Sequence, residues 1–248
     1  MLDRPIHKQT VQAPFAKDAP LIMLPGTLCD ERLFVPVLAA LGRDATVSPL
    51  RDAESAAAMA QLVLAGAPAR FSLCGFSLGA IVALEIMAQA PERVERLALI
   101  GCNPGPMDSE RAKARAAVAA GDFVAWSCGS PNGASGRESL RTLLDEMAAG
   151  LSPTDYRQQT EMTLHRADSR PRLGEIEVPT LVVCGADDRV CPPALSRDIA
   201  FAIAGSRLAI ISNAGHYVLL ENPVSVAHEL AAWLDQPNHS LIPRSHHD

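Results

Sequence analysis

Short apolar runs alternate along the chain with longer stretches that mix apolar and polar positions. Six of the short runs predict strands, at Leu21–Leu24, Ala45–Val47, Phe71–Cys74, Leu97–Ile100, Thr180–Cys184 and Leu208–Ile211. The longer stretches predict helices at Glu31–Leu41, Ala53–Ala65, Leu78–Gln89, Pro193–Ile203 and Val224–Leu234. Nearly continuous apolar strands between helices are typical of a parallel sheet covered on both faces. The pattern therefore predicts an α/β fold with a mostly parallel central sheet.

The alternation stops over residues 103–175, which open with Asn103-Pro104-Gly105-Pro106. Helical stretches are expected there at Ser109–Ala120, Glu138–Ala149 and Thr154–His165, with a loop of small residues at Ser127–Gly136. A helical excursion between strands commonly forms a lid over the strand ends. We therefore expect a core of residues 1–102 and 176–237, a helical lid of residues 103–175, and a flexible polar tail at 238–248.

Composition narrows the class of protein. With 248 residues, 48% of them hydrophobic, the chain is long enough for one large domain with a buried core. Its net charge of −6 argues against nucleic acid and against an anionic membrane surface as partners. The six cysteines include no C-x-x-C pair and no zinc spacing, and the first 19 residues lack the apolar centre of a signal peptide. We expect a cytoplasmic protein with reduced cysteines that uses no metal and no cofactor.

The segment Gly75-Phe76-Ser77-Leu78-Gly79 joins a predicted strand to a predicted helix. A serine in such a turn sits on strained backbone, flanked by glycines because bulkier residues would clash. The turn places the hydroxyl at a helix N-terminus, where backbone N–H groups favour developing negative charge. The pattern alone arises by chance in many chains, but its position between strand and helix makes Ser77 a candidate nucleophile.

A nucleophilic serine needs a base, and His216 is the best placed histidine. It lies in the loop after the last predicted strand, whereas the others lie in the tails, within a helix or at the end of a lid helix. The imidazolium formed in catalysis also needs a fixed carboxylate. Asp187 and Asp188 both follow the strand Thr180–Cys184, and residue type alone does not separate them; Asp108 is a further alternative.

Serine, acid and histidine in this chain order, each after a different predicted strand, resemble the α/β-hydrolase superfamily and its serine esterase-like members. The matching motifs are Leu24-Pro25-Gly26-Thr27, Gly75-Phe76-Ser77-Leu78-Gly79, Gly185-Ala186-Asp187-Asp188 with Pro192, and Gly215-His216 with Glu221-Asn222-Pro223. The resemblance covers residues 20–234, the lid being the least matched part.

The resemblance adds three expectations. The family's acid stands three residues after the glycine that ends the strand, which selects Asp188. The oxyanion is expected to meet the backbone N–H groups of Leu78 and Thr27, although Pro25-Gly26 replaces the more common His-Gly of that loop. The lid is expected after the sixth core strand.

The function expected on these grounds is hydrolysis of a small or medium carboxylic ester, a small-molecule substrate, through an acyl-enzyme on Ser77. Met107 and Trp126 are candidate substrate-binding residues, and Phe123, Met147 and Met162 are further candidates for an apolar pocket. Arg111, Lys113 and Arg115 are interpreted as a solvated helix face, with binding of an anionic substrate as the alternative.

Other functions fit the same residues. A lactonase, a thioesterase or a C–C bond hydrolase of β-diketone-type acids would use the same three side chains. From a different class, a receptor-like member of the superfamily would bind a ligand with little turnover.

Overall fold

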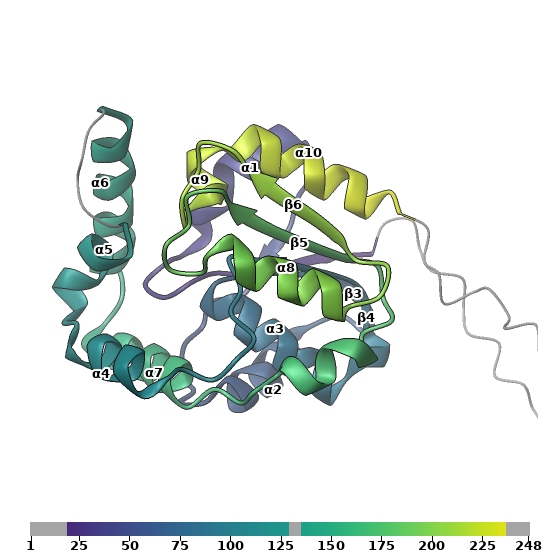
Figure 1. Ribbon diagram of the computed structural model, residues 1–248, viewed down its shortest axis with the longest axis horizontal. Helices are drawn as coiled ribbons and strands as arrows, with labels where there is room; N and C mark the ends of the chain where they lie inside the picture. The colour runs from purple at the N-terminus through teal and green to yellow at the C-terminus, as the bar shows by residue number, and fades with distance from the viewer. Residues whose placement is uncertain (1–18, 129–134, 237–248) are drawn as a thin grey trace, which may run out of the picture.

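The computed structural model describes residues 19–128 and 135–236. Within these ranges, six parallel strands form one sheet in the order β2-β1-β3-β4-β5-β6 (Figure 1). The strands are β1 (Leu21–Leu24), β2 (Thr46–Val47), β3 (Phe71–Phe76), β4 (Val94–Ile100), β5 (Thr180–Gly185) and β6 (Arg207–Ile211). The order reverses direction beside β1, so the strand that carries Ser77 at its end lies near the centre of the sheet.

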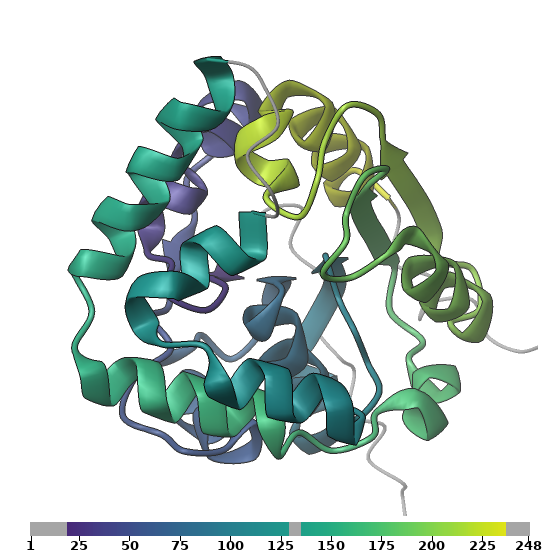
Figure 2. The same ribbon diagram turned by 60° about the vertical axis from the view of Figure 1, so that its left-hand side comes forward.

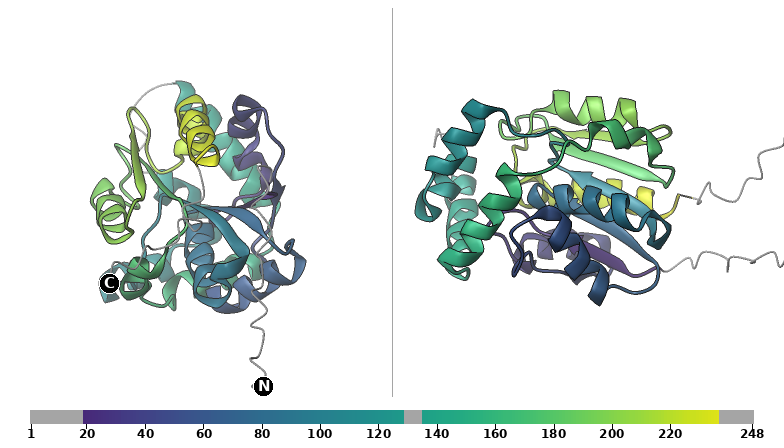
Figure 3. Two further views of the ribbon diagram at one scale, coloured as in Figure 1. Left: turned by 90° about the vertical axis from the view of Figure 1, so that its right-hand side faces the viewer. Right: turned by 90° about the horizontal axis from the view of Figure 1, so that it is seen from below.

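Successive side chains of the central strands point to opposite faces of the sheet and pack into two separate hydrophobic cores. Leu73 and Leu99 belong to the first core, while Cys74 and Ile100 belong to the second. The first face is covered by α2 (Ala56–Gly66), α3 (Leu78–Gln89) and α8 (Pro193–Ala202). The second is covered by α1 (Val35–Leu41), α9 (Val218–Glu221) and α10 (Pro223–Leu234), as Figure 3 shows end-on. Every residue of β1, β3, β4 and β5 is buried, which accounts for their continuous apolar runs.

Asp30 and Asn222 cap the N-termini of two helices, as the local sequence predicts. Asp30 accepts a hydrogen bond from the backbone N–H of Arg32 at 3.0 Å and begins the 3₁₀ helix η1 (Glu31–Leu33). Asn222 accepts one from Ser225 at 3.4 Å and begins α10. The helix predicted over Glu31–Leu41 is thus two elements, because the chain turns at Phe34 before α1 begins.

Between β4 and β5 the chain forms a helical insertion: α4 (Ser109–Ala117), α5 (Ala120–Cys128), α6 (Ser135–Ala149), α7 (Pro153–Leu164) and the 3₁₀ helix η3 (Arg170–Glu175). Helices α4 to α7 lie on the side to which the strands point (Figure 1). Figure 2 brings this side forward and shows α4 beside α7 and α5 beside α6. The insertion therefore lies at the carboxyl ends of the strands. The loops that follow β3, β5 and β6 begin at the same edge of the sheet.

The structure corrects the expected position and outline of this insertion. It follows the fourth strand in the described chain rather than a sixth, because only four apolar runs form strands between residues 19 and 102. The helix predicted over Ser109–Ala120 ends at Ala117, and α5 continues into the stretch expected to be a loop. The other end of that stretch, Ser135 and Gly136, begins α6. Residues 129–134 and the expected tail (238–248) lie outside the described residues. Among the helices described, none combines the length and the apolar character needed to cross a lipid bilayer.

Candidate active site

Ser77 occupies the turn between β3 and α3 with φ 52° and ψ −110°, a strained conformation for a residue with a side chain. A side chain at Gly75 would run into the backbone of Gly79 and Ala80, and one at Gly79 would meet the carbonyl groups of Leu24 and Pro25. The backbone N–H of Ser77 donates to Ile100 at 2.9 Å, which ties the turn to β4. The two glycines thus allow the close packing that holds the strained serine in place.

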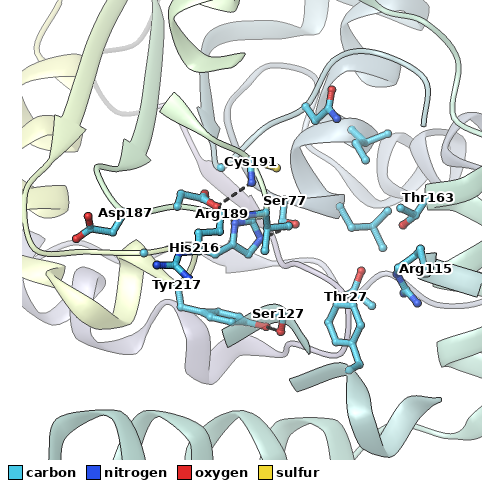
Figure 4. A pocket seen from close by; sticks show the side chains of 18 of the residues that line it. Thr27, Ser77, Arg115, Ser127, Thr163, Asp187, Arg189, Cys191, His216 and Tyr217 are labelled. Atoms are coloured by element: carbon cyan, nitrogen blue, oxygen red, sulfur yellow. Dashed lines mark hydrogen bonds and ion pairs between the residues drawn. The ribbon is translucent and has the colours of Figure 1, made fainter. Parts of the chain in front are cut away.

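Ser77, His216 and Asp188 form a chain of hydrogen bonds at the carboxyl edge of the sheet. His216 Nε2 lies 3.1 Å from Ser77 Oγ, and His216 Nδ1 lies 2.9 Å from Asp188 Oδ2. Figure 4 shows His216 directed toward Ser77. His216 is 7% exposed and Asp188 is 4% exposed, so both bonds are shielded from competing water. Ser77 follows β3, Asp188 follows β5 and His216 follows β6.

The Asp188 carboxylate is fixed by the loop that carries it. Its Oδ1 accepts from the backbone N–H groups of Val190 and Cys191, both at 2.8 Å, which leaves Oδ2 for His216. Asp187 is exposed, and the Nδ1 position of His216 is taken by Asp188, so Asp187 and Asp108 do not hold the ring. The geometry thus separates two adjacent aspartates that residue type left equivalent.

The His216 ring is held by neighbouring aromatic rings. The Phe76 ring centroid lies 5.1 Å away and that of Tyr217 5.5 Å away. The Tyr217 hydroxyl lies 2.7 Å from Ser127 Oγ, so this ring is in turn linked to α5 of the insertion. Sequence reasoning did not single out Tyr217 or Ser127, which are 90 positions apart and meet only in the folded chain.

The expected oxyanion donors lie at two backbone positions beside Ser77. Leu78 is the first residue of α3, where an N–H has no acceptor within the helix. Thr27 is 8% exposed and lies in a turn closed by the bond from Cys29 N to Gly26 O at 3.2 Å. Thr27 and Leu78 both line the cavity that Ser77 faces.

A glutamine of the insertion holds this turn in place. The backbone N–H of Leu28, a residue with φ 57°, donates to Gln159 Oε1 at 2.8 Å. Gln159 Nε2 donates to the Leu50 carbonyl at 3.0 Å, and the side chain is 1% exposed. A leucine with positive φ is strained, so this buried bridge offsets part of the cost. Nothing in the local sequence marks Gln159, since its partners are 131 and 109 positions away.

A cavity of about 1250 Å³ extends from Ser77 and His216 to the insertion. Met107 and Phe123 line it, as expected. Met147 and Met162 do not: both are fully buried, because each packs into the core on one face of the sheet. Trp126 lies in α5, and its side chain is outside the described part of the structure. Within residues 19–128 and 135–236, no cluster of three or more His, Cys, Asp and Glu side chains is arranged to hold a metal ion.

Residues 18–229 match the sequence profile of the alpha/beta hydrolase family. The chain belongs to this family. Among its relatives, the pimeloyl-[acyl-carrier protein] methyl ester esterase of Chromobacterium violaceum is 27% identical over 205 residues, covering 76% of this chain and 79% of the relative. A protein named as the carbamate hydrolase RutD, from Klebsiella pneumoniae, is 29% identical over 190 residues and covers 71% of each chain.

Solved structures agree on the α/β-hydrolase fold. The enol-lactonase of Burkholderia xenovorans superimposes with a TM-score of 0.74 at 23% identity, covering 88% of this chain and 92% of that one. An esterase of Thermogutta terrifontis gives a TM-score of 0.71 at 20% identity, covering 88% and 89%. The protein is an enzyme of the α/β-hydrolase type.

Proposed function

We propose that the protein hydrolyses a carboxylic ester of small or medium size, with Ser77 as nucleophile, His216 as general base and Asp188 as the residue that orients the histidine. The observation that carries the proposal is the hydrogen-bond chain from Asp188 through His216 to Ser77, at 2.9 Å and 3.1 Å, beside a large cavity. Relatives named as esterases are consistent with this bond type. In this proposal the described residues 103–128 and 135–175 act as a lid over a core formed by the described residues 19–102 and 176–236.

In the first half of the reaction, His216 Nε2 takes the proton of Ser77 as Oγ attacks the ester carbonyl carbon. Asp188 accepts a hydrogen bond from the Nδ1–H group of His216 and so stabilises the imidazolium, while the Nδ1 proton stays on the ring. The backbone N–H groups of Thr27 and Leu78 donate to the oxyanion, and each such donor is typically worth ~10²–10³-fold in rate. His216 then protonates the departing alcohol, leaving the acyl group on Ser77.

In the second half, His216 takes a proton from a water molecule, which attacks the acyl carbonyl. The same two N–H groups stabilise the second oxyanion, and collapse of this intermediate returns the proton to Ser77 Oγ and releases the acid. Lactones, thioesters and β-diketone-type acids present a carbonyl to the same groups, so they belong in the test of the proposal.

The test combines covalent labelling with a substrate panel. A fluorophosphonate should label the wild-type protein at Ser77, and a p-nitrophenyl ester chain-length series should show turnover. Ser77→Ala should lose labelling and lower kcat by at least about 10⁴-fold. Ser212→Ala is the matched control, because Ser212 is an exposed serine just after β6.

A folded Ser77→Ala variant that keeps wild-type turnover would reject the nucleophile. Faster turnover of lactones, thioesters or β-diketone-type acids than of esters would reassign the bond while keeping the three residues. A folded protein that neither labels nor turns over any of these compounds would favour the receptor-like function.

A further inference from the structure

One cation in the cavity differs from the others. Arg115 projects from α4, lines the same cavity as Ser77 and is 2% exposed. Lys113, two positions earlier, is 75% exposed and agrees with the solvated helix face expected from the sequence. Arg115 contradicts that expectation, because α4 packs beside α7 and directs this side chain inward.

Two aromatic rings hold the Arg115 guanidinium. Its central carbon lies 4.6 Å from the Phe123 ring centroid and 5.0 Å from that of Tyr156. Nη1 donates to the Tyr156 hydroxyl at 2.7 Å, and this hydroxyl donates to the Val118 carbonyl at 2.7 Å. The aromatic faces attract the cation, and the hydroxyl fixes its orientation. The side chain is therefore positioned in advance rather than free to rotate.

Among the described residues, no carboxylate balances the charge of Arg115. No ion pair joins it to a carboxylate among the described residues, and its Nη2 is buried without a hydrogen-bond partner there. Of the described residues that line the cavity, no other has such an orphaned side-chain atom. Burial lowers the pKa of the guanidinium, and the Tyr156 hydroxyl partly offsets this, but arginine keeps its proton in proteins. A buried charge without an opposite charge nearby lowers the stability of the fold. Such a group therefore calls for an explanation, and binding of an anionic ligand would provide one.

The other cations that line the cavity are engaged or exposed. Arg166 donates to the Gly105 carbonyl at 2.6 Å and to the Thr163 carbonyl at 3.2 Å. Arg141 faces Asp145 at 3.5 Å, and Arg189 is exposed. In Figure 4, Arg115 and Asp187 stand at opposite sides of the pocket, with Ser77 and His216 between them in this view. Among the described residues that line the cavity, Arg115 is thus the one buried cation with a side-chain nitrogen that lacks a hydrogen-bond partner.

We propose that Arg115 binds a carboxylate of the substrate, so that the natural substrate is an ester that also carries one free carboxylate group. This inference rests on the proposed hydrolase function for its reaction. A carboxylate suits the site because a planar guanidinium donates two parallel bonds to it. A single negative charge also balances the charge of the buried Arg115 guanidinium.

The first experiment compares monomethyl esters of straight-chain dicarboxylic acids, from succinic to suberic, with analogues in which the free carboxylate is a primary amide. The amide has nearly the same shape without the charge. At the best chain length, kcat/KM should favour the carboxylate by about 100-fold in the wild-type enzyme. Arg115→Met should bring this ratio close to 1, while Lys113→Met, the exposed control on the same helix, should leave it at the wild-type value.

The second experiment measures binding without hydrolysis, so that the two proposals fail separately. Calorimetry with Ser77→Ala should detect the preferred half ester, and adding Arg115→Met should weaken its binding by about 100-fold. If no ester is hydrolysed but binding still depends on Arg115, the hydrolase proposal fails and the carboxylate site stands. If Ser77 labels and esters turn over, but the carboxylate-to-amide ratio is near 1 for every length, the carboxylate site is rejected.

Arg115→Lys covers the case in which Arg115→Met does not fold. Lysine keeps the charge but loses the paired donors, so the ratio should fall by about 10-fold rather than vanish. A wild-type ratio in a folded Arg115→Lys variant would reject the paired-donor geometry. Melting curves of all variants establish that they are folded.

Discussion

The sheet and the helical insertion contribute to the same cavity in different ways. The sheet side supplies Ser77, Asp188 and His216 on loops whose backbones are tied to buried strands. The insertion supplies Arg115, Phe123 and Ser127 from helices that are polar and exposed on their outer faces. Every residue of β3 and β4 is buried, whereas much of α4 and α6 is exposed. In this molecule the buried sheet carries the residues of the proposed chemistry. The more exposed insertion lines the cavity that a substrate would enter and adds a positive charge to it.

Gln159 is an exception to this contrast between the sheet and the insertion. It belongs to α7 of the insertion, yet its side chain holds the turn that carries Thr27. The contrast therefore predicts the largest effects for changes on the sheet side, smaller effects for Gln159, and small effects for helix ends of the insertion.

Asp188→Asn tests the sheet side and should lower kcat by about 10⁴-fold. The amide group of asparagine can donate a hydrogen bond to Nδ1 of His216, whereas the carboxylate only accepts one from Nδ1–H, so the ring is held in an unproductive tautomer. The measurement is ester turnover together with the rate of fluorophosphonate labelling. Asp187→Asn is the matched control, because the neighbouring carboxylate is exposed and should tolerate the change within a few-fold. Equal losses in both variants would contradict the assignment of Asp188.

Gly79→Ala tests the packing beneath Ser77. The added methyl group would overlap the carbonyl groups of Leu24 and Pro25, so the helix or the strand must shift. We expect the free energy of unfolding to fall by about 3 kcal/mol. Gly66→Ala in α2 is the control, since nothing lies near its added methyl group and the change should be neutral or slightly stabilising. Urea denaturation of both variants gives the comparison, and an unaffected Gly79→Ala would show that the turn has room to relax.

Gln159→Leu tests the link between the insertion and the oxyanion turn. The leucine fills similar space but leaves the Leu28 N–H and the Leu50 carbonyl without their partners. We expect kcat to fall by about 10- to 100-fold with little change in KM, because an oxyanion donor acts in the transition state. Gln158→Leu, the adjacent and less buried glutamine, serves as control. A rise in KM alone would instead make Gln159 part of the substrate surface.

Ser152→Ala tests a helix end of the insertion and should cost about 1 kcal/mol of unfolding free energy. Ser152 Oγ accepts from Asp155 N at 3.1 Å, and Asp155 Oδ2 accepts from Ser152 N at 2.8 Å. Thr154→Ala, in the same exposed turn, is the control. If the free energy of unfolding fell by several kcal/mol, the Ser152 cap would contribute far more to the stability of α7 than expected for an exposed helix end.

The pKa of Asp155 gives this last test a pH dependence. Burial alone would raise the pKa of the carboxyl group, but the hydrogen bonds with Ser152 outweigh it and the pKa lies below its ordinary value. A lowered pKa means that the stabilisation is present above the unfolded-state pKa near 4 and is lost as the pH falls through the folded-state value. The difference between wild type and Ser152→Ala should therefore shrink below about pH 4.

Local sequence predicted the sheet and its covering helices well, because burial on both faces leaves a strong apolar signal. β1 and α3 have the predicted bounds. β4 begins three residues earlier than predicted, because Glu95 and Arg96 read as polar. In the structure Glu95 is 3% exposed and pairs with Arg70 at 3.1 Å, so its charge is matched by a residue from outside the strand. The short helix α9 was not predicted.

The insertion was predicted less accurately, because its helices carry weaker apolar patterns and depend on distant partners. The order of Ser77, Asp188 and His216 along the chain, and the glycines of the turn, are local features that the sequence alone determined. The choice of Asp188 over its neighbour needed either the family pattern or the hydrogen bond to His216. Only the tertiary structure decided that Arg115 is buried and Lys113 is not, and that Gln159 reaches Leu28. The reason is physical: strained turns and buried strands are specified by neighbouring residues, whereas the burial of one charge depends on how helices far apart in sequence pack together.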